Sequence, residues 1–179
     1  MQDRGGGYAR FGAMIAASML VMFALMYLNV YEAGHVRFSQ TRLFMTFIMG
    51  AGMAVVMLSF MLAMYRDKQA NLAIYGASVL VFAFALWLAR SQATVDDRAY
   101  MSAMIPHHSI AILTSERARI EDARVRALAD EIMRAQRREI REMEWLIDDI
   151  AANGPARTAT EAAARPVPAF NGDPQTEEE

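Results

Sequence analysis

The sequence contains no cysteine. A chain without thiols forms no disulfide scaffold, no zinc finger and no thiolate-held iron–sulfur cluster, and it offers no thiol nucleophile. An excess of one charge is also missing, because 18 basic and 20 acidic residues leave a net charge of −2 over 179 residues, so nucleic acid is not an expected partner. Histidine is scarce, with three residues, whereas methionine supplies 15. A soft metal ion would therefore depend on methionine and histidine ligands.

Apolar residues are abundant instead, at 55% of the chain, and they gather in three long uncharged runs. The runs cover residues 11–31, 43–65 and 72–89. At about 1.5 Å of rise per residue, such runs cross a bilayer core of roughly 30 Å. The first run is too long for the apolar part of a cleavable signal peptide, and the lack of charge inside the runs disfavours a proton-coupled transporter. We expect three transmembrane helices within residues 11–90, in contact with lipid, preceded by a cytoplasmic segment 1–10.

The basic residues that flank the runs do not decide the orientation of these helices. Each side carries four of them, namely Arg4, Arg10, Arg66 and Lys68 against Arg37, Arg42, Arg90 and Arg98. With three spans, however, the first loop and the whole region after Arg90 lie on one side of the membrane. His35 in that loop is therefore expected to face the same compartment as His107 and His108.

Residues 91–153 are predicted to form a helical hairpin outside the membrane. Thr94 and Asp97 have the spacing of a capping box, which would open the first helix. Apolar residues then recur at every third and fourth position from about Asp122, and Asn153 and Gly154 mark the end of the second helix.

Two helices of this size do not cover their own apolar stripes. The stripe of the second helix includes Leu128, Ile132, Leu146 and Ile150. A second copy of the chain would bury it in a four-helix bundle, and packing on the ends of the spans is the alternative; we expect a homodimer. Residues 154–179 are rich in Ala, Pro, Thr and Glu, and we expect this tail to be disordered because it buries too little surface to offset its ordering entropy.

The first helix of the hairpin carries the residues best suited to chemistry. Met101, Met104 and His108 fall at positions i, i+3 and i+7, so their side chains line one stripe of a regular helix. His107 points about 100° away from that stripe. Pro106 removes a backbone donor immediately before the histidine pair, and a kink there would turn His107 toward the same space.

Across the hairpin, Met133 and Met143 share the face that the thioethers of the first helix would meet. Thioether sulfur and imidazole form a soft, neutral ligand set that suits Cu(I) better than Cu(II) and suits Mg²⁺ or Ca²⁺ poorly. The alternative is core packing, because methionine fills irregular cores. Methionines also recur in the second span, at Met45, Met49, Met53, Met57 and Met61. They would form either a conduit for copper or an adaptable surface for helix packing. No serine–histidine–acid set, phosphate loop or haem motif indicates an enzyme.

The string MSAMIPHHSIAILTSERARIEDARVRALADEIMRAQRREIREMEWL resembles the domain of unknown function 305 family. Its Met-x-x-Met-x-x-His-His signature corresponds to residues 101–108, and its Gln-x-x-Glu-Ile-x-x-Met signature to Gln136, Glu139, Ile140 and Met143. The resemblance implies a ferritin-like helical bundle, usually exported or periplasmic, with copper bound by some members. The three-span front with HVRFSQTR in its first loop is similar to a membrane-bound subgroup of that family.

These observations predict an all-α, multi-pass protein of a bacterial inner membrane with its C-terminal domain in the periplasm. It would bind copper for buffering, sensing or transfer to a copper-handling protein. The predicted ligands are Met101, Met104, His107, His108 and Met143, with Met133 and His35 as further candidates. The alternative is a structural or interaction module of a membrane assembly without bound metal.

Overall fold

A computed structural model describes residues 4–174, and within that range the chain is all-α, as predicted, with six α-helices and no strand. The helices are α1 Arg4–Leu25, α2 Gln40–Phe60, α3 Lys68–Ser91, α4 Asp97–Arg117, α5 Ala123–Asn153 and α6 Ala159–Ala164. A single 3₁₀ turn at Ala33–His35 precedes α2. The described residues divide into two compact units, the first formed by residues 4–28 and 40–94 and the second by residues 29–39 and 95–174.

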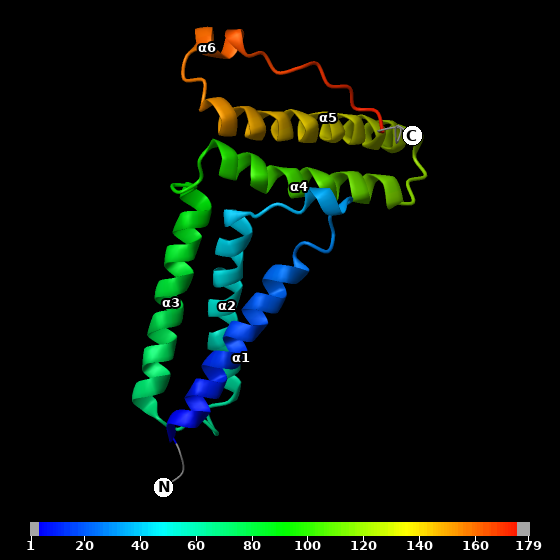
Figure 1. The fold of residues 1–179 in the computed structure, drawn as a ribbon. Helices are drawn as coiled ribbons and strands as arrows, with labels where there is room; N and C mark the ends of the chain where they lie inside the picture. The colour runs from blue at the N-terminus through cyan, green and yellow to red at the C-terminus, as the bar shows by residue number, and fades with distance from the viewer. Residues whose placement is uncertain (1–3, 175–179) are drawn as a thin grey trace. The chain divides into compact units, whose positions relative to one another are not determined.

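The first unit is a bundle in which α2 packs against both α1 and α3 (Figure 1). Phe11, Leu58 and Tyr65 are buried at its centre. All three helices are long and apolar enough to span a membrane, over Gly6–Leu25, Gln40–Phe60 and Lys68–Ser91. Large apolar side chains cover the outside of the bundle, and Phe60, for example, is 88% exposed.

The first helix is displaced from the predicted 11–31 run, because it already begins at Arg4 and ends at Leu25. Turns follow, in which the Tyr27 and Leu28 amides donate to carbonyls three residues back. The chain then leaves the first unit, since the Tyr31 amide donates to the Ser109 hydroxyl, 2.6 Å away in the second unit. This tertiary contact explains why an uncharged stretch does not continue as a helix. Residues 1–3 of the predicted N-terminal segment lie outside the described residues.

The second unit is built on a hairpin in which α4 and α5 lie side by side, and residues 33–35 contact α4 (Figure 1). Helix α5 begins after Asp122 and ends at Asn153, as the periodicity predicts. Helix α4 begins after Asp96, whose side chain accepts from the Ala99 amide at 2.8 Å. The predicted capping role of Thr94 is therefore wrong, because its hydroxyl donates to the Gln40 side chain at 2.9 Å. Asp96 is closer than Thr94 to the unpaired backbone amides of the first turn of α4, so its carboxylate accepts a hydrogen bond there directly.

The segment after Asn153 differs from the predicted disordered tail. Thr158 and Glu161 form a capping box that starts α6. Beyond α6, the Arg165 guanidinium lies 2.6 Å from Asp149 of α5. Composition alone does not reveal these attachments, because they depend on where α5 presents its charges. Residues 175–179 of the predicted tail lie outside the described residues.

Candidate functional site

The predicted thioethers converge where α4 packs on α5. Met101 and Met143 are 6% and 9% exposed, and they belong to one buried cluster with three isoleucines: Ile105, Ile112 and Ile140. Met104 packs against the same cluster. The helical period explains this convergence, because residues three, four and seven apart share a face of each helix. Three of the seven predicted ligands are thus gathered in one place.

His108 lies beside this cluster and is held at both ring nitrogens. Its Nδ1 is 2.9 Å from the Met104 carbonyl oxygen, and its Nε2 is 2.8 Å from a carboxylate oxygen of Glu139 on α5. The carbonyl is an acceptor, so Nδ1 carries a hydrogen and donates it. That hydrogen bond leaves Nε2 as the ring atom that faces the Glu139 carboxylate, and a metal ion at Nε2 would have to displace that contact.

Glu139 is the residue that the list of predicted ligands lacks. Its position in the Gln-x-x-Glu-Ile-x-x-Met signature, four residues before Met143, was the signal that could have found it. The guanidinium of Arg138 also lies 3.7 Å from this carboxylate. Within residues 4–174, no group of three or more histidine and acidic residues is arranged to hold a metal ion, so a metal centre here would need the methionine sulfurs.

The other predicted ligands lie apart from the methionine cluster. His107 is exposed, with its ring centre 6.3 Å from that of His108, and α4 continues through Pro106 from Asp97 to Arg117. Met133 is half-buried on α5, ten residues before Met143. His35 belongs to the same compact unit as the other two histidines, but its ring contacts Ser109 rather than His108.

His35 is positioned by a hydrogen-bond chain that the sequence did not predict. The fully buried Ser109 hydroxyl accepts from the Tyr31 amide and lies 3.0 Å from Nδ1 of His35. A hydroxyl can donate to Nδ1 or accept from it, and the tautomer of the ring decides which of the two it does. Nε2 lies 3.8 Å from a carboxylate oxygen of Glu32. Since Ser109 is buried, its hydroxyl orients the ring and is not an exposed nucleophile.

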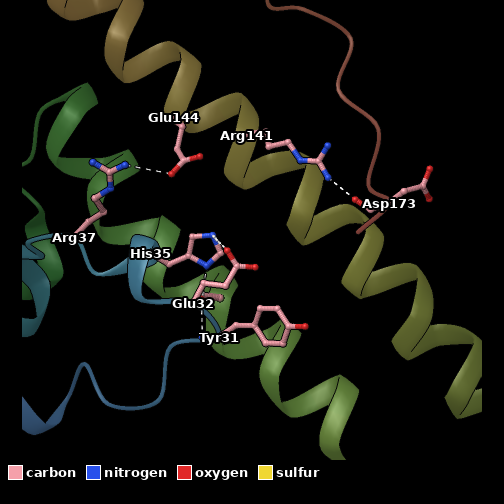
Figure 2. Close-up of polar contacts among 8 residues, drawn as sticks. Tyr31, Glu32, His35, Arg37, Arg141, Glu144 and Asp173 are labelled. Carbon is pink, nitrogen blue, oxygen red and sulfur yellow. Dashed lines mark hydrogen bonds and ion pairs between the residues drawn. The ribbon is translucent and has the colours of Figure 1, made fainter. Parts of the chain in front are cut away.

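Further polar contacts surround this loop. Figure 2 shows Arg37 reaching Glu144 of α5, with 3.2 Å between their side-chain nitrogen and oxygen atoms. The carboxylate of Glu116 accepts a hydrogen bond from Tyr31, and this bond is the main reason that the pKa of the Tyr31 phenol lies above its usual value of 10.0. Burial acts in the same direction, whereas Arg137 acts against it.

The end of the described chain closes the other side of this region. Arg141 donates to the Asn171 side chain at 2.9 Å and to the Asp173 carbonyl, as Figure 2 shows for the second contact. At Gly172 the chain passes so close to α5 that an added Cβ would lie 2.1 Å from the Arg134 carbonyl oxygen. Only glycine fits such a close approach.

Comparison with known proteins relates the C-terminal half of the chain to a known family. Residues 88–174 match the family described as Domain of unknown function (DUF305). The match extends beyond the predicted hairpin 91–153 into the tail. Uncharacterized protein L153 of Acanthamoeba polyphaga mimivirus is 29% identical over 144 residues, which cover 76% of this chain and 93% of the viral protein. No solved structure is significantly similar to the chain.

Proposed function

Because residues 88–174 form a DUF305 domain, we propose that this protein is a membrane-anchored copper-binding protein whose site lies between α4 and α5. The observation that carries the proposal is the gathering of Met101, Met104 and Met143 in one cluster with His108 at its side. Thioether and imidazole donors favour Cu(I) over harder ions. The proposed role is binding rather than catalysis.

The arrangement of His108 suits a ligand. Its Nδ1–H bond to a backbone carbonyl is the contact that typically fixes the tautomer of a metal-bound histidine, and an ion at Nε2 would take the place of the present contact with Glu139. Met101, Met104, Met143 and His108 are the proposed ligands. Three predicted ligands are left out, because His107 is exposed, Met133 is not part of the cluster and the His35 ring contacts Ser109.

The proposal places the three apolar helices in a bacterial inner membrane, in contact with lipid, and the DUF305 domain in the periplasm. Their lengths and exposed apolar surfaces support the first part. The second part rests on the family resemblance alone, because the flanking basic residues are equal in number on the two sides and do not decide the orientation. In this position the domain would buffer or sense copper, or transfer it to a copper-handling protein.

A structural module without metal is the competing interpretation. It is favoured by the low exposure of Met101 and Met143, because buried methionines are ordinary core residues. The two interpretations predict different effects of substitutions at these methionines. In a core, Met101→Leu and Met104→Leu are nearly neutral, with an expected cost below about 1.5 kcal/mol.

Thermal melting of the full chain with and without Cu(I), under reducing conditions, tests the proposal. Wild type should melt at a higher temperature with Cu(I), because a ligand stabilises the state that binds it. The Met101→Leu/Met104→Leu double variant and His108→Ala should lose that shift, and the double variant should keep its metal-free melting temperature. The proposal fails if wild type shows no shift, or if Zn²⁺ or the double variant gives the same one.

A further inference from the structure

A cavity in the second unit lies beside the methionine cluster and shares two of its isoleucines. It has a volume of about 370 Å³ and is bounded by the loop before α2, by α5 and by Pro174 at the end of the described chain. The shared residues, Ile112 and Ile140, are 1% and 3% exposed, so they offer little apolar surface to a ligand. The polar lining includes Tyr31, His35, Arg137 and Arg141, together with the carboxylates of Glu32 and Glu144. Converging polar groups of this kind orient small molecules in binding sites.

Two arginines supply positive charge to this cavity. Arg137 and Arg141 are four residues apart, so they share one face of α5. Within residues 4–174, neither forms an ion pair: Arg137 interacts with the Tyr31 hydroxyl, and Arg141 donates to an amide oxygen and a backbone carbonyl. A guanidinium has five N–H donors, so most of those on Arg141 stay available.

His35 lines the same space. Its Nδ1 lies 3.0 Å from the Ser109 hydroxyl, and its Nε2 lies 3.8 Å from a carboxylate oxygen of Glu32. The carboxylates limit the charge of a ligand. Glu144 is paired with Arg37, and Glu32 lies near His35, so a doubly charged anion would meet two negative groups as well as the arginines.

We propose that this cavity binds a small organic monocarboxylate. The carboxylate would accept hydrogen bonds from Arg137 and Arg141, since guanidinium and carboxylate groups match in geometry and charge. The proposed copper ligands include neither arginine, although Ile112 and Ile140 border both sites.

Calorimetric titration of the metal-free full chain in detergent micelles tests the proposal, with benzoate as the probe and empty micelles as the blank. Benzamide has the same shape without the charge, and it should bind at least tenfold more weakly. Arg137→Gln and Arg141→Gln should each weaken benzoate binding about tenfold or more, because each removes charge-assisted hydrogen bonds. Arg141→Lys keeps the positive charge but lacks the two parallel N–H donors of a guanidinium. Its benzoate affinity should lie between those of wild type and Arg141→Gln.

Arg119→Gln is the matched control, because Arg119 is exposed in the loop between α4 and α5, outside the cavity. It should leave benzoate affinity within twofold of wild type, and far-ultraviolet circular dichroism should show unchanged helicity in every variant used. The proposal is overturned if benzoate does not bind at millimolar concentration, or if benzamide or inorganic phosphate binds as well as benzoate. Equal affinity in wild type and both arginine-to-glutamine variants would also overturn it.

Discussion

Ile105 is completely buried between α4 and α5, in the cluster that also contains Met101 and Met143. Ile105→Ala should lower the free energy of unfolding by about 2–5 kcal/mol, because it removes buried methyl groups and leaves a cavity. Ile105→Val should cost about 1 kcal/mol. Urea unfolding followed by Trp145 fluorescence, in a Trp87→Phe background, measures both. A loss under about 1 kcal/mol for the alanine variant would contradict this packing.

Asp122 makes the stability of α5 depend on acid. Its hydrogen bonds with the Arg124 side chain and backbone lower its pKa from 3.8 to about 2. A carboxyl whose pKa is lower in the folded than in the unfolded chain stabilises the fold at any pH above the unfolded-state pKa. This contribution is therefore fully present above about pH 4 and disappears as the pH falls through about 2.

Asp122→Asn keeps a capping side chain but has no charge to lose. Wild type should therefore melt at a higher temperature than this variant at pH 5, and most of the difference should be gone at pH 2, where the folded carboxyl is half protonated. Melting curves of both chains at intervals between these values measure it. A difference that does not change with pH would assign the effect to something other than the Asp122 carboxylate.

At the scale of elements, the segment from Arg165 to Pro174 is held along α5 by contacts at both ends. Gly172→Ala should release its far end, because the new Cβ would overlap the Arg134 carbonyl. Chymotrypsin should then cleave after Phe170, which precedes Asn171, several-fold faster than in wild type. Gly76→Ala is the control, because an added Cβ there meets nothing within 4 Å. Equal cleavage rates in the two variants would contradict the docked arrangement.

An exposed apolar stripe on α5 supports the proposed homodimer. Val125, Leu128 and Ile132 are 49%, 56% and 37% exposed, whereas Leu146 and Ile150 of the predicted stripe pack on the core. Leu128→Glu should therefore abolish self-association, because it would bury a carboxylate without a partner. Light scattering of the full chain in detergent measures its mass, with Arg119→Glu as control. A monomeric wild type would refute the homodimer.

At the scale of the whole molecule, the proposed topology makes a prediction about compartments. Alkaline phosphatase fused after Asn153 should be active, because that enzyme folds only where disulfides form. A fusion in the loop at Asp67, between α2 and α3, should be inactive. The opposite pair of results would place the DUF305 domain in the cytoplasm and remove the periplasmic copper role.

The sequence predicted elements better than it predicted their ends and contacts. Periodicity located α5 correctly, because a long amphipathic helix repeats its pattern over eight turns or so. It placed the end of the first helix at Tyr31, although α1 ends at Leu25, because an uncharged stretch carries no sign of the tertiary contact that diverts it. The methionine cluster was predictable for the same reason as α5, since its members lie on two helical faces.

The sequence by itself determined the three apolar helices, the hairpin and the facing positions of Met101 and Met143, because each depends on local spacing along the chain. Only the tertiary structure decided the partners of His35 and Arg141. Ser109 is 74 positions from His35, and Asn171 is 30 positions from Arg141. Contacts over such separations leave no periodic pattern, because they arise only when the folded helices bring the loop and the chain's end to one face of the hairpin.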